Sequence, residues 1–149
     1  MSDLAILFAC FFSGISLIVN AEATVMLAAS VFAMEPMFAG AAAAFGQAFL
    51  LLFLYRYGGG LALKWKWLQK KTDKARRRYE AGLEKRFLFF GASAALVGVP
   101  PVLAMAVLAP SFDARASHFI AIAIPLRFVR FWFVAALGAQ LDVWIRSVI

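Results

Sequence analysis

Residues 56–86 read RYGGGLALKWKWLQKKTDKARRRYEAGLEKR and hold eleven of the 15 Lys and Arg residues of the chain. The sequence on either side of this basic block is almost entirely apolar. Short loops rich in Lys and Arg stay on the cytoplasmic side of a membrane, so the block predicts the orientation of the protein. We therefore expect two apolar halves joined by a cytoplasmic segment.

The composition favours an integral membrane protein over a soluble domain. Of the 149 residues, 64% are hydrophobic and 15% are charged, and the mean hydropathy is +0.85. Soluble domains are closer to half apolar and one-quarter charged. The net charge of +7 is concentrated beside apolar runs of membrane length. Anionic lipid headgroups are therefore the expected partner of this charge, and nucleic acid is not.

The first apolar tract, Leu4 to Met34, is interrupted in its middle by Asn20 and Glu22. It is longer than the roughly 20 residues that one helical crossing requires. Two interpretations stay open, namely one tilted helix or two half-helices that turn around residues 20–22. Irregular backbone at membrane depth must be covered by protein or line a cavity. We expect the helix to break within Val19–Ala23.

The second tract, Met37 to Tyr55, follows a turn at Glu35-Pro36 and is expected to be an unbroken spanning helix. Its first half is rich in Gly and Ala, with Gly40 and Gly46 each four residues from an Ala. Small residues at this spacing let neighbouring helices approach closely.

The second half of the chain has a similar plan. The third tract, Phe87 to Ala109, contains Pro100-Pro101, so we expect a break within Gly98–Pro101. The fourth tract, Phe119 to Leu141, has Pro125 early and two arginines near its middle, and is expected to be an unbroken helix. Interrupted segments at corresponding places in two halves are typical of inverted-repeat transporters.

The predicted fold is an all-α integral membrane domain over residues 1–149. It consists of two inverted repeats, residues 1–57 and 87–149, each a broken or re-entrant hairpin followed by a transmembrane helix. Residues 58–86 form the basic cytoplasmic connector, whose helical spacing indicates an amphipathic helix at the membrane surface.

Three charged residues lie inside the apolar tracts: Glu22 in the first, and Arg127 and Arg130 in the fourth. Charges at membrane depth are costly, so we expect them to pair. A guanidinium fork suits carboxylate and phosphate alike. One interpretation is a substrate or proton site formed by these residues with Asn20. The other is a structural ion pair that holds the repeats together.

Six basic residues around the connector are candidates for contacts with lipid headgroups: Arg56, Lys64, Lys66, Arg76, Arg77 and Arg78. The alternative is a solvated loop whose charges only set the orientation. His118 is the single histidine and Cys10 the single cysteine. No nucleophile and base stand at a recognisable spacing. The sequence therefore predicts no enzyme, no metal site and no cofactor.

Four short stretches spread over most of the chain carry a family resemblance: VNAEATVMLAA at 19–29, GQAFLLLFLYRYG at 46–58, RYEAGLEKRFLFFG at 78–91 and RFWFVAALG at 130–138. They resemble motifs of the DedA superfamily, in its small YqaA-like branch with the SNARE-associated or VTT domain. The resemblance implies two re-entrant hairpins that meet at the midplane of a bacterial inner membrane. It also implies a flippase or scramblase for undecaprenyl phosphate or phospholipids, with proton linkage as one option.

Two departures from the family pattern keep a second function open. Val19 stands where the family has the Pro-Gly before the glutamate, and Gly98 to Pro101 replace the charged residue of the second hairpin. The alternative function is a scaffold or accessory subunit that transports nothing. Its partner would be a second copy of the chain or another membrane protein.

The basic connector gives a topology prediction. In a Cys10→Ala background, single cysteines at Gln69 or Thr72 should be protected from an impermeant maleimide in intact cells. They should react after the membrane is permeabilised, because the positive charge keeps this segment inside. Labelling from outside intact cells would contradict a cytoplasmic connector.

Overall fold

The protein is helical in every element of the described chain. The computed structural model describes residues 3–16, 20–58, 83–97, 102–112 and 114–148. The chain forms two compact units: Met1–Leu50 with Ile124–Ile149 is unit 1, and Leu51–Ala123 is unit 2. Unit 1 therefore combines the beginning of the sequence with its end.

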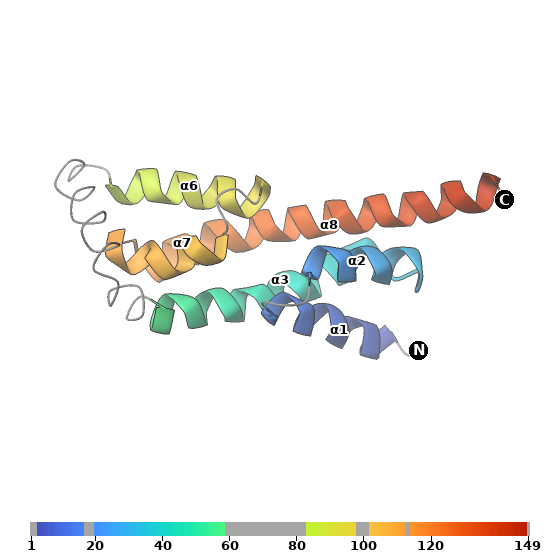
Figure 1. Ribbon diagram of the computed structural model, residues 1–149, viewed down its shortest axis with the longest axis horizontal. Helices are drawn as coiled ribbons and strands as arrows, with labels where there is room; N and C mark the ends of the chain where they lie inside the picture. Colours follow the sequence, from blue (N-terminus) through green and yellow to red (C-terminus); the bar gives the residue numbers. More distant parts are fainter. Residues whose placement is uncertain (1–2, 17–19, 59–82, 98–101, 113, 149) are drawn as a thin grey trace. The chain divides into compact units, whose positions relative to one another are not determined.

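The first apolar tract forms two helices, α1 (Asp3–Ile15) and α2 (Ala21–Ser30), as the second interpretation of the sequence predicts. Asn20 is extended, with φ −74° and ψ 106°, so the helical backbone is interrupted there. The interruption at Asn20 falls within the predicted range Val19–Ala23, although Ala21 to Ala23 are already helical. The two helices pack against each other within unit 1 (Figure 1).

A tight turn connects α2 to α3 (Pro36–Phe53). Ala33 adopts the left-handed conformation, with φ 53°, and the Met34 amide donates to the Ala28 carbonyl at 3.0 Å. Proline suits the first position of a helix because its missing N–H would have no intrahelical partner there. The predicted turn at Glu35-Pro36 is therefore present, and it starts the long helix.

Two helices of the described chain are long and apolar enough to cross a bilayer. The first is α3 continued by the π-helix η1 (Leu54–Gly58), which gives 23 residues at a mean hydropathy of 1.9. The second lies within α8 (Ala116–Val148) and covers Ala116–Leu141 at the same mean hydropathy. Figure 1 shows α8 as one continuous helix despite Pro125.

Glycines allow the helices of unit 1 to approach each other at the backbone. A Cβ added to Gly46 would collide with the Phe11 carbonyl oxygen of α1, and one on Gly40 would lie 2.9 Å from the Trp132 amide of α8. The Gly and Ala spacing of α3 therefore serves contacts with two different helices. Gly138 is close to the backbone of Met26 in the same way.

Small side chains make up most of the core of unit 1, with Phe131 as its one buried ring among the described residues, whereas many large side chains are exposed. Six of the ten buried residues of its core cluster are alanines: Ala28, Ala29, Ala39, Ala43, Ala44 and Ala135. Phe8, Phe12, Phe45 and Phe49 are 53% to 64% exposed. Soluble monomers rarely expose large contiguous apolar surfaces.

Unit 2 contains η1, α6 (Leu83–Val97), α7 (Val102–Leu108) and η2 (Ala109–Phe112). Gly58 lies against the Val107 side chain, which brings η1 onto α7. The Tyr55 hydroxyl donates to the Ala114 carbonyl at 3.1 Å. The second predicted interruption, residues 98–101, lies outside the described residues, as do residues 59–82 of the basic connector.

Substitution of Gly46 and of Gly91 by alanine should change the melting temperature in opposite directions. Gly46→Ala should lower the melting temperature, because its methyl group would overlap the backbone of α1. Gly91→Ala is the matched control: its methyl group would meet only a ring edge of Phe119, at 3.0 Å, and alanine favours the helix. Thermal unfolding in detergent measures both. Equal melting temperatures would contradict the close approach of α1 and α3.

Candidate polar site in unit 1

Asn20 positions the half-buried carboxylate of the first apolar tract, Glu22. Its side-chain oxygen accepts the backbone N–H groups of Glu22 at 3.0 Å and Ala23 at 3.4 Å, so it caps α2. Glu22 therefore lies in the first turn of α2, where the helix dipole favours a negative charge. Asn20 was a candidate for substrate or proton binding. In the structure, its side-chain carbonyl oxygen caps α2 and so fixes the position of Glu22 in the first turn.

Glu22 meets both arginines of α8. Arg130 Nε donates to Glu22 Oε1 at 2.7 Å, which is a short charge-assisted hydrogen bond. Arg127 Nη1 lies 3.9 Å from the same oxygen, which is an ion pair but not a hydrogen bond. Residues three apart share a helix face, so α8 presents both guanidiniums to one carboxylate. The structure thus brings together the three charges that the sequence singled out.

Gln47 of α3 is a further member of this cluster that the sequence did not predict. Its Oε1 accepts a hydrogen bond of 2.7 Å from Arg127 Nε, although Gln47 is only 5% exposed. The Arg127 guanidinium also lies over the Phe131 ring, with Cζ 5.1 Å from the centroid. A lone amide in a membrane-length apolar helix was the signal that could have identified Gln47, since such side chains bond across helices.

The three charged side chains of the cluster are partly buried, and the cluster reaches the surface. The side-chain exposures of Arg127, Arg130 and Glu22 are 12%, 22% and 32%. Two guanidiniums and one carboxylate leave a formal charge of +1, which suits an anion. No buried polar side-chain atom of the described chain lacks a hydrogen-bond partner. The arrangement can bind an oxyanion or hold three helices together, and it contains no nucleophile.

The remaining predicted site residues do not join the cluster. Arg56 is exposed on η1. The other five proposed headgroup contacts lie outside the described residues: Lys64, Lys66, Arg76, Arg77 and Arg78. Among the described residues, no group of three His, Cys, Asp or Glu side chains is placed to hold a metal ion.

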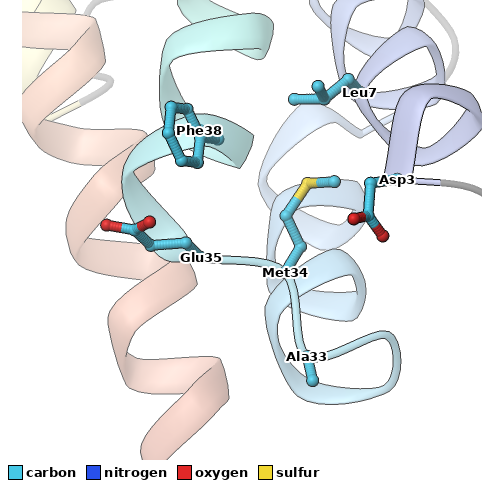
Figure 2. Close-up of a pocket in the computed structure, with 6 residues that line it drawn as sticks. All are labelled: Asp3, Leu7, Ala33, Met34, Glu35 and Phe38. Atoms are coloured by element: carbon cyan, nitrogen blue, oxygen red, sulfur yellow. The ribbon is translucent and has the colours of Figure 1, made fainter.

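A separate pocket of about 390 Å³ lies in unit 1 where α1 begins and α3 starts. Figure 2 shows the Met34 side chain between Asp3 and Glu35, whose carboxylates flank the pocket, with Leu7 and Phe38 on its wall. Asp3 is in the first turn of α1, and Glu35 directly precedes α3. Acidic groups at these places stabilise helix N-termini, which accounts for them without a ligand.

Comparison with protein-family models, with curated proteins and with solved structures finds no match for this chain. The geometry of the cluster of Glu22, Gln47, Arg127 and Arg130, together with the sequence motifs, is therefore the basis for assigning a function.

The two arginines should contribute unequally to stability. In double-mutant cycles with Glu22→Gln, Arg130→Gln should show a coupling energy of about 1–2 kcal/mol, between those of exposed and buried pairs. Arg127→Gln should couple to Glu22 by less than about 1 kcal/mol, because 3.9 Å exceeds hydrogen-bonding distance. Denaturant unfolding measures both. Equal couplings would show that the carboxylate does not prefer Arg130.

Proposed function

We propose that this chain is an integral membrane protein that binds a phosphate-bearing lipid and moves it across the bilayer. Glu22, Arg127 and Arg130 form its substrate site. The observation that carries the proposal is the gathering of one carboxylate and two guanidiniums among otherwise apolar helices. Intramembrane ionisable residues generally mark substrate or proton pathways.

The distribution of side chains by size supports a membrane environment. Alanine and glycine mediate many of the helix contacts, whereas several phenylalanines, among them Phe8, Phe45 and Phe49, are more than half exposed. In lipid there is no hydrophobic gain from burying large apolar groups, so helices associate through small residues that allow close packing. The lengths of α3 with η1 and of α8 agree with two crossings.

The short helices α1 and α2 suit a re-entrant hairpin. With 13 and 10 residues, they measure only about 20 and 15 Å, less than the roughly 30 Å hydrocarbon core. The hairpin would bring Glu22 into the membrane from one side, while protein covers its turn. An equivalent hairpin in residues 87–109, an inverted-repeat plan and a cytoplasmic connector in a bacterial inner membrane belong to the same proposal.

A phosphate group fits the charge and the donors of the site. The formal charge of +1 attracts an anion, and guanidinium N–H groups match phosphate oxygens bidentately. The motif resemblance to the DedA superfamily favours the same substrate class, polyprenyl phosphates or phospholipids. Membership of that superfamily is part of the proposal. Glu22 would compete with the phosphate for the arginines, and its protonation would release them.

A scaffold function is the second candidate, and a specific observation favours it. Glu22 is already bonded to Arg130, and Arg127 to Gln47, so the cluster is satisfied without a ligand. Such a network would join α2 and α3 to α8 and leave the membrane surface for a partner protein. The two candidates differ in whether the wild-type protein moves lipid.

Reconstitution into proteoliposomes tests the proposal. The wild type should translocate undecaprenyl phosphate or phospholipid in a pH-dependent manner. Glu22→Gln should assemble normally yet lose the pH dependence, because an amide cannot bind or release a proton. Glu35→Gln, which changes an exposed carboxylate away from the cluster, is the matched control and should behave as the wild type.

Two results would count against transport. A wild-type protein that moves neither class of lipid would leave the scaffold as the surviving candidate, provided that Glu22→Gln lowers the melting temperature. Unchanged melting and unchanged transport in Glu22→Gln would remove Glu22 from both functions.

A further inference from the structure

Gln47 is the uncharged member of the polar cluster, and its backbone is held at a fixed place. The neighbouring Gly46 lies against the Phe11 carbonyl of α1. A Cβ on Gly14 of α1 would be 2.9 Å from the backbone nitrogen of Gln47. This part of α3 is therefore in close contact with α1. The Gln47 side chain extends from a rigid contact between two helices toward α8.

Arg127 is restrained by two contacts, and neither of them is a hydrogen bond from its terminal nitrogens, Nη1 and Nη2. Gln47 Oε1 accepts from Nε at 2.7 Å, and the guanidinium lies over the Phe131 ring. A hydrogen bond at Nε and a ring beneath the guanidinium together restrict its position and tilt. Nη1 is 3.9 Å from Glu22 Oε1, beyond hydrogen-bonding distance.

The two arginines thus have different relations to Glu22. Arg130 engages the carboxylate directly through Nε, whereas the Nε of Arg127 is occupied by a neutral amide. A neutral acceptor orients a guanidinium without cancelling its charge. A carboxylate at position 47 would orient it and cancel the charge as well.

We propose that Gln47 is a positioning residue that reserves Arg127 for the phosphate oxygens of the substrate, while Arg130 neutralises Glu22. This inference rests on the proposed function and deepens it, because it assigns the substrate contact to one arginine. The ligand chemistry is an oxyanion, carried by a lipid rather than free in solution.

Substitution at position 47 separates positioning from stability. Gln47→Glu should pair with Arg127 and keep or raise the melting temperature, yet weaken oxyanion binding at least about tenfold, since it cancels the charge that attracts the ligand. Gln47→Leu should lower both the melting temperature and the affinity for the oxyanion, because it leaves Arg127 Nε without its acceptor. Ser13→Ala removes another buried hydrogen bond of unit 1, to the Cys10 carbonyl at 2.7 Å, and should leave binding unchanged.

The measurement is calorimetric titration of the full chain in detergent, with melting curves for each variant. The probes are farnesyl phosphate, inorganic phosphate and farnesol. We expect wild-type binding in the order farnesyl phosphate, then inorganic phosphate, with farnesol the weakest. Equal affinities for the two phosphates would assign the site to a soluble anion and overturn the lipid part of the inference.

Three further outcomes are distinguishable. Undiminished farnesyl phosphate binding by Gln47→Glu would overturn the positioning role while leaving the proposed function standing. Affinities that follow melting temperatures across all variants, Ser13→Ala included, would show that Gln47 is only structural and also overturn it. Absence of wild-type binding to farnesyl phosphate would contradict the proposed function itself.

Discussion

A charge among apolar helices is stable only when an opposite charge or a polar group lies within reach, and this constraint connects α2 and α3 to α8. Glu22 requires Arg130, and Arg127 requires Gln47. Each pair joins segments far apart in the sequence, since the residue numbers of the partners differ by 108 in the first pair and by 80 in the second. The polar cluster thereby helps to explain why the end of the chain packs with its beginning in unit 1.

The small residues of α3 make this pairing geometrically feasible. Close approach of α1 at Gly46 and of α8 at Gly40 brings backbones near each other, so side chains of ordinary length can meet. The same arrangement leaves several phenylalanines exposed, which is unfavourable in water and neutral in lipid. The packing is therefore of the kind found in lipid, and it is compatible with the proposed site for a lipid headgroup.

The helical class, the long helices and the interruption near Asn20 could be predicted from the sequence, because the length of an apolar run and the polar residues that interrupt it are local signals. The same logic of charge at membrane depth identified Glu22, Arg127 and Arg130 as partners. It could not identify Gln47, because periodicity along α3 does not show which helix each face meets. Nor did it indicate that α3 ends in a π-helix, which depends on the register of backbone hydrogen bonds. The inverted-repeat plan and the function of the basic connector stay predictions.

The central claim is that Arg127 contacts lipid phosphate inside the membrane. Solid-state NMR can test it directly, through the dephasing of arginine ¹³Cζ signals by ³¹P in bilayers containing undecaprenyl phosphate. The difference between wild-type and Arg127→Lys spectra isolates one side chain from the other arginines. We predict strong dephasing of the Arg127 signal, at a C–P separation of about 4 Å set by a guanidinium–phosphate hydrogen-bonded pair. An Arg127 signal without ³¹P dephasing would contradict the account.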